Sequence, residues 1–139
     1  MMTLMNARTG QAVASAVELA HTRAERRRGL LGRDHLGAAA ALVLSPCCAV
    51  HTAFMRFAID LVFVDRHGSV VRVVPRLGPW RMAVSARAHA VVELAGGTVQ
   101  PGDVVVGDRL YLAPVVADGA SICPARDQKS DTAVLLSRI

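Results

Sequence analysis

Two neighbouring cysteines and a histidine form the densest group of reactive side chains in this sequence. Cys47 and Cys48 lie four and three residues before His51, in the segment SPCCAVHTAFMRFAIDLVFVD. A thiolate and an imidazole at this spacing could share one zinc ion, or the imidazole could activate a thiol nucleophile. Zinc would need further ligands, such as Asp60 or a more distant residue. Because the sequence has no second pair of closely spaced cysteines or histidines and no Gly-x-Ser-x-Gly motif, a thiol- or zinc-dependent hydrolase is only the alternative hypothesis.

The leading hypothesis is a non-enzymatic binding module that uses the 47–60 loop. Unusual polar and aromatic side chains gather in loops without a complete catalytic set, which is typical of a binding site on a rigid scaffold. Trp80 and Arg81 would suit the wall of a pocket, although a single tryptophan can also fill a core. We expect a small anionic ligand or a protein partner. The candidate ligand-binding residues are His51, Thr52, Met55, Arg56, Asp60, Trp80, Arg81 and Glu93.

Two acidic residues stand inside strongly apolar segments. Asp60 is the second residue of IDLVFV, and Glu93 follows two valines in VVEL. Strand alternation would place Asp60 on one face with Val62 and Val64. A carboxylate in such a place is usually satisfied by backbone amides or by an arginine, so we favour a structural role over general-base catalysis. A mechanism with both carboxylates stays open, because the sequence does not place them together.

The composition narrows the classes of function. With 139 residues, 53% of them hydrophobic, the chain can form one domain with its own core. The formal charge of +5 would suit an anionic partner. However, Lys129 is the only lysine among 16 basic residues, which indicates a general bias toward arginine, and the 4% of aromatic residues are few for stacking on single strands. We therefore do not expect nucleic acid as a partner, and we expect no cofactor.

The sequence also bears on the compartment. The longest apolar run, near Ala38–Leu44, is far short of a membrane span, and the first ten residues do not have the pattern of a signal peptide. Three cysteines, of which Cys123 is the third, do not form a disulfide framework. We expect a cytoplasmic protein with free thiols and no membrane contact, as a monomer or a weak homo-oligomer.

Short apolar segments separated by turn residues predict a mainly β fold. Thr22 and Glu25 have the spacing of a capping box and predict a short helix from Arg23 to Leu31, ending at Gly32, with a basic face in solvent. The predicted strands cover residues 3–5, 12–20, 40–44, 59–64, 69–74, 90–94 and 109–112.

These elements predict a small barrel or a jelly-roll-like sandwich with one short helix inserted near the N-terminus. We expect a single β domain over residues 1–113. Residues 114–139 would form a C-terminal extension that is partly disordered or adds a strand, near residues 134–136, to a sheet edge. A third hypothesis is an interaction subunit that adds a strand to a partner's sheet.

Four short motifs follow one another along the chain: Arg26-x-x-Gly29-Leu30, Asp60-x-x-Phe63, Val92-Glu93 followed by Gly97, and Gly107-Asp108. In this order they resemble a known family, the domain of unknown function 192 (DUF192). The resemblance runs from about residue 10 to residue 112 and implies a small all-β domain with the helix packed on it. It implies no activity. His51-Thr52 stands where the family more often has an aromatic residue and a methionine, with Met55 just after.

Overall fold

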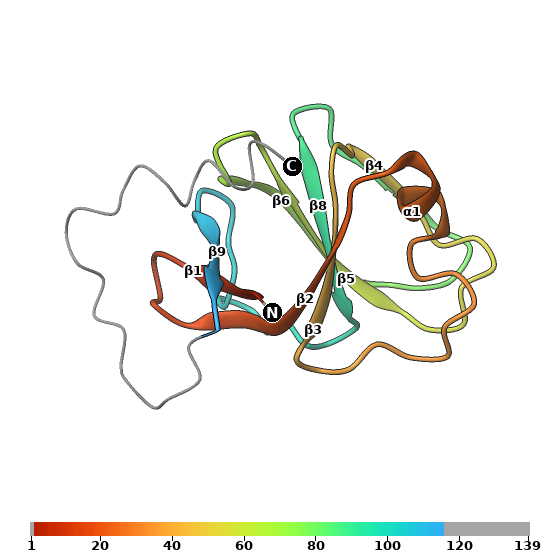
Figure 1. Ribbon diagram of the computed structural model, residues 1–139, viewed down its shortest axis with the longest axis horizontal. Helices are drawn as coiled ribbons and strands as arrows, with labels where there is room; N and C mark the ends of the chain where they lie inside the picture. The colour runs from red at the N-terminus through yellow and green to blue at the C-terminus, as the bar shows by residue number, and fades with distance from the viewer. Residues whose placement is uncertain (1, 116–139) are drawn as a thin grey trace.

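A computed structural model describes residues 2–115, which form nine strands and one helix (Figure 1). Of the predicted C-terminal extension over residues 114–139, the part from residue 116 onward, with Cys123 and the expected edge strand, lies outside the described residues. In chain order the elements are β1 (Met2–Asn6), β2 (Ala12–Ala20), α1 (Arg23–Arg28), β3 (Ala40–Leu44), β4 (Ala49–His51), β5 (Ile59–Val64), β6 (Val70–Leu77), β7 (Met82–Val84), β8 (Ala90–Ala95) and β9 (Leu110–Pro114).

Seven strands form one large mixed sheet in the order β6-β5-β8-β3-β2-β1-β9, which confirms the mainly β fold. All its neighbouring strands are antiparallel except β2 and β3. A parallel pair needs a long crossover. Residues 21–39, which contain α1, provide it. Figure 1 shows α1 and β4 at one end of the molecule and β1 and β9 at the other.

The barrel alternative of the predicted fold is wrong, because the sheet does not close. The edge strands β6 and β9 share no ladder, and one isolated bridge between Ser69 and Arg109 joins their beginnings. The chain between β8 and β9 runs through turns instead of a strand. Its backbone hydrogen bonds to β6 are confined to Val70, whose amide donates to the Asp108 carbonyl and whose carbonyl accepts from the Gly107 amide. The sheet therefore stays open along the rest of these edges. The jelly-roll connectivity is not confirmed either.

Each face of the large sheet carries its own apolar core. One core contains Val62 and Val64 from β5, and the other contains Ile59, Leu61 and Phe63. This is the alternation predicted from the sequence. The second core is covered by a small antiparallel sheet of β4 and β7, which the sequence did not predict, and by loop residues that follow α1.

The helix is shorter than predicted. The capping box of Thr22 and Glu25 is present, but the helix ends at Arg28, and the Gly29 amide donates back to the Glu25 carbonyl. No residue of α1 is buried; Leu30, just beyond it, enters the second core. In the described part of the chain, no helix has the length and apolar character needed to cross a bilayer.

Candidate functional site

The predicted site residues separate into a surface group and a buried group. His51, Trp80 and Arg81 lie exposed around β4 and β7, and Thr52 is buried directly beneath them. Three others lie elsewhere: Met55 packs in the second core, whereas Asp60 and Glu93 are buried in the large sheet. The structure therefore does not gather the eight residues into one pocket.

Thr52 fixes the surface group from below. Its hydroxyl donates to the Gly78 carbonyl at 2.6 Å and accepts from the Arg81 amide at 2.9 Å. Its backbone carbonyl accepts from the amides of Trp80 and Met55. Because these bonds tie the loop after β4 to the loop before β7, Thr52 sets the positions of the side chains above it.

The two loops present an aromatic pair to solvent. The rings of Phe54 and Trp80 have centroids 4.6 Å apart at an angle of 60°, which is an edge-to-face arrangement. Both are strongly exposed, Phe54 by 74% and Trp80 by 65%. Both backbones have positive φ, 64° and 61°, a conformation that is rare and costly for large side chains.

The outer face of the small sheet extends this pair. Strand pairing places His51 opposite Met82, and Met82 is 67% exposed. Val84, two residues along β7, is also exposed. We call Phe54, Trp80, Met82 and Val84 the aromatic surface. Of these residues the sequence analysis found only Trp80, and the signal that it missed is the phenylalanine between Thr52 and Met55.

Arginines surround the aromatic surface. Arg81 is exposed between Trp80 and Met82, and the Arg72 guanidinium donates to the Val84 carbonyl. Arg56, predicted to bind a ligand, is paired with Asp34. Among the described residues, neither Arg72 nor Arg81 pairs with a carboxylate, so both keep positive charge at this surface.

Asp60 has a structural role in the sheet. It is fully buried, and its carboxylate accepts from the backbone amides of Arg76 at 2.8 Å, Gly97 at 3.1 Å and Val99 at 2.9 Å. The expected partners were backbone amides or an arginine, and the observed donors are backbone amides. They come from the end of β6 and from the turns after β8.

Glu93 is the buried carboxyl without a complete set of partners. It is 3% exposed, and its Oε2 has no hydrogen-bond partner. Burial raises its pKa to about 7, and the charge of Arg33 opposes this shift. Strand register pairs it with Leu61, while Asp60 pairs with Leu94. The two carboxyls therefore face opposite sides of the sheet, which excludes a joint mechanism.

Of the two cysteines that the structure describes, Cys47 has surroundings that disfavour a thiolate. Burial, with a smaller contribution from the charge of Glu93, raises the pKa of Cys47, the opposite of what a thiolate nucleophile needs. The Cys47 thiol donates to the Ala49 carbonyl. Within residues 2–115, no three His, Cys, Asp or Glu side chains gather as metal ligands would. No observation supports the hydrolase alternative.

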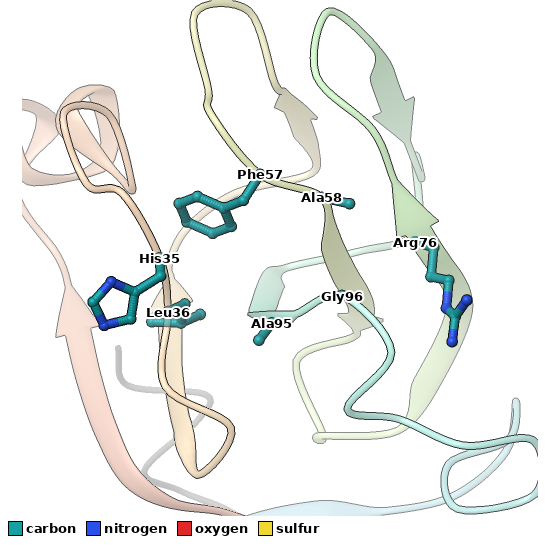
Figure 2. Close-up of a pocket in the computed structure, with 7 residues that line it drawn as sticks. All are labelled: His35, Leu36, Phe57, Ala58, Arg76, Ala95 and Gly96. Carbon is teal, nitrogen blue, oxygen red and sulfur yellow. The ribbon is translucent and has the colours of Figure 1, made fainter.

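Two cavities lie away from the aromatic surface. The first, of about 380 Å³, is lined by His35, Leu36, Phe57, Ala58, Arg76, Ala95 and Gly96 (Figure 2). Figure 2 shows the His35 ring and the Arg76 guanidinium on opposite sides of it, directed apart. A Cβ on Gly96 would lie 2.9 Å from the Ala58 carbonyl oxygen, so this wall admits only glycine. The first cavity thus has no convergent polar groups.

The open mixed sheet with a small sheet over one face defines the structural class of this β protein. Known proteins are similar to it in sequence and in fold. The sequence matches the DUF192 family, described as uncharacterized, over residues 4–112. The chain belongs to this family.

Individual proteins are similar to the chain in sequence or in fold. A UPF0127 protein from Pyrococcus furiosus is 43% identical over 63 residues, which are 45% of this chain and 53% of that protein; the chain thus spans about half the length of this curated relative. A candidate transcription regulator from Sinorhizobium meliloti has a TM-score of 0.67 at 23% identity, covering 78% of this chain and 89% of its own. A protein of unknown function from Novosphingobium aromaticivorans has the same TM-score and identity, with 78% and 81% covered.

The family motifs can now be explained as structural devices. Gly29 ends the helix, and Phe63 is fully buried. The buried Asp108 carboxylate accepts from the Arg8 guanidinium at 2.7 Å and from the Asn6 side-chain amide at 2.8 Å. These partners, chiefly the arginine, lower the pKa of Asp108 to about 2. Glu93 is a motif residue to which these contacts give no structural role, because its buried Oε2 has no partner.

Proposed function

We propose that this protein is a non-enzymatic binding module whose aromatic surface holds an acidic segment of a protein partner. The observation that carries the proposal is the pair of exposed rings, Phe54 and Trp80, held on two loops by a buried threonine. A soluble domain seldom exposes several large apolar side chains side by side unless they meet another molecule.

The chemistry of the surface favours a protein partner. Aromatic residues and arginine are enriched at the centres of protein interfaces, because they give large contact area at a low cost in side-chain entropy. Phe54, Trp80 and Met82 present such area on loops and strands, and neither of the two cavities opens among them. An extended or helical segment with apolar side chains would therefore fit better than a small enclosed ligand.

The charges favour an acidic segment. Arg72 and Arg81 lie at the edge of the aromatic surface without a carboxylate partner among the described residues. Carboxylates that flank the apolar anchors of a partner would pair with them. Such pairs contribute more to specificity and association rate than to affinity, so the aromatic contacts dominate the expected binding energy.

The backbone of the loops supports preorganisation. Positive φ at Phe54 and at Trp80 costs of order 1–3 kcal/mol at each residue. The Thr52 hydrogen bonds hold this arrangement in the free protein. A surface that is already ordered loses less entropy on binding.

The test uses a displayed library of random peptides selected against the whole protein. Trp80 is the sole tryptophan, so its fluorescence reports directly on peptides that cover the surface. We expect the selected peptides to combine Asp or Glu with apolar residues, and to shift the emission. Phe54→Ser should weaken binding about tenfold or more, and Arg81→Gln should weaken it less, with an effect that fades at high salt.

Val106→Ser is the matched control, because Val106 is an exposed apolar residue between β8 and β9. It should bind the selected peptides like the wild type. Peptides that bind without changing Trp80 fluorescence, or equally well to Phe54→Ser, would overturn the proposal. So would inorganic phosphate that competes for Trp80, which would favour a small anion. If the protein formed a dimer that dissociated in the Phe54→Ser variant, the partner of the aromatic surface would be a second copy of the chain and not an acidic segment.

A further inference from the structure

The second cavity lies on the face of the large sheet that is opposite the small sheet of β4 and β7, and its lining is predominantly apolar. Its volume is about 430 Å³, toward the lower end of the range for small-molecule sites. Val104 belongs to the first core, and Val73 and Val99 pack against that core. The lining residues are Val73, Pro75, Arg76, Gly97, Val99, Gln100, Pro101 and Val104.

Arg76 brings a charge to this apolar wall. Its backbone has a φ of 47° and donates to the buried Asp60 carboxylate. Its side chain lies across Gly97, where a Cβ would be only 3.2 Å from a guanidinium nitrogen. Gly97 itself has a φ of 84°. The backbone conformation therefore favours glycine there, and a Cβ would also displace the Arg76 guanidinium.

The direction of the side chain assigns Arg76 to the second cavity. In Figure 2 its guanidinium is turned away from His35, Leu36 and Phe57, which line the first cavity. Gly97, over which it lies, lines the second. Arg76 thus borders the first cavity, but its guanidinium does not point into it.

The guanidinium is also available to a ligand. Among the described residues Arg76 forms no ion pair. It is the backbone amide of Arg76, not its guanidinium, that donates to the buried Asp60 carboxylate. Arginine donors match the two oxygens of a carboxylate in geometry. Gln100, the other polar side chain of the lining, already donates to the Gly97 carbonyl.

We propose that the second cavity binds a carboxylate carrying a short aliphatic group, which pairs with Arg76 while its hydrocarbon contacts the valines and prolines. Two sources share this chemistry, a free aliphatic acid and the C-terminus of a peptide that ends in an apolar residue. The site is independent of the aromatic surface and does not rest on the proposed function.

The test is titration of the ¹⁵N-labelled full chain with sodium hexanoate, followed by amide chemical shifts. We expect saturable shifts at Gly97, Val99 and Val104, and weaker binding of hexan-1-ol, which lacks the charge. Arg76→Gln should reduce hexanoate affinity about tenfold or more, as expected for a charged hydrogen-bonded pair. Arg76→Gln keeps the backbone amide that donates to the Asp60 carboxylate. The amide spectrum of the variant reports whether the fold is retained.

Arg66→Gln is the matched control, because Arg66 is an exposed arginine in the turn between β5 and β6; it should bind hexanoate like the wild type. A second arm compares a tetrapeptide ending in Leu with its C-terminal amide. Preference for the free acid peptide over hexanoate would identify a chain terminus, and the reverse a small acid. Absence of saturable shifts with both, equal binding of hexanol, or an unchanged affinity in Arg76→Gln would overturn the proposal.

Discussion

Asp60 and Glu93 lie on the adjacent central strands β5 and β8 and are almost equally buried, but their surroundings differ. Asp60 accepts three backbone hydrogen bonds. Glu93 has one oxygen without a partner, and burial raises its pKa to about 7. Two carboxyls of one sheet can therefore have different roles in stability. Asp60 organises the chain around it, and we expect Glu93 to make stability depend on pH.

The position along the strands explains the difference. Asp60 is at the end of the sheet, where the chain after β8 leaves the ladder and its amides are available. Glu93 is paired on both sides, with Leu42 of β3 and Leu61 of β5, so the amides around it are used by the ladders. The nearest opposite charge, Arg33, already binds Glu18 at 2.7 Å.

The largest effect is expected for Asp60→Ala. Three amides that now donate to the carboxylate would lose their acceptor, and each such loss costs about 1–3 kcal/mol. We expect a loss of at least about 3 kcal/mol in the free energy of unfolding, measured by urea denaturation at neutral pH. Amide exchange should become faster at Arg76, Gly97 and Val99 before the rest of the sheet.

Asp103→Asn is the control for this prediction, because Asp103 is exposed and its carboxylate accepts one hydrogen bond, from the Gln100 backbone amide. It should cost less than about 1 kcal/mol. If Asp60→Ala were no more destabilising than Asp103→Asn, the carboxylate would not be the organising group of this end of the sheet.

Glu93→Gln should change the pH dependence of stability. The pKa of Glu93 is raised from an ordinary 4.5 to about 7, so the folded state holds a proton that the unfolded state releases. Stability should fall as the pH rises from about 4.5 through about 7, by on the order of 3 kcal/mol in full. The variant cannot ionise there, so its unfolding free energy should be flatter over this interval.

Asp34→Asn, which removes an exposed carboxylate, should keep the wild-type slope. The measurement is a series of urea titrations across the same interval with all three proteins. A wild type whose stability rises between these pH values would show that Glu93 ionises at an ordinary pKa, and that its surroundings do not differ from those of a solvated acid.

The sequence predicted those features that depend on local pattern. Strands 12–20, 40–44 and 59–64 have the predicted bounds, and the alternation in β5 placed Asp60 correctly on its face. The donors to Asp60 could not be predicted, because they come from residues 16 to 39 positions away and depend on sheet topology. The strands β4 and β7 have three residues each and pair across a gap of 30 residues, so neither carries a pattern of its own.

The candidate site shows the same limit. Trp80 stood out as the only tryptophan, whereas Phe54 looked like one more apolar residue in a mixed loop. Their approach depends on two positive φ angles and on Thr52, which joins loops 26–29 residues apart. The closed barrel failed for a related reason: local strand patterns do not tell whether the last edge meets the first.

The smallest and most specific effect concerns the position of Arg33 between two acids. Glu18 and Glu93 are both paired with Leu42 across the sheet, so they lie about 10 Å apart on one face. Arg33→Gln should raise the pKa of Glu93, since the positive charge now lowers it. Glu18→Gln should lower that pKa, because Arg33 would be released from its partner toward Glu93.

Each change should alter the unfolding free energy by less than about 1 kcal/mol, as is usual for exposed ion pairs. Titration of the Glu93 carboxyl by ¹³C NMR would measure both shifts, and two shifts in the same direction would show that Arg33 is not shared between the acids.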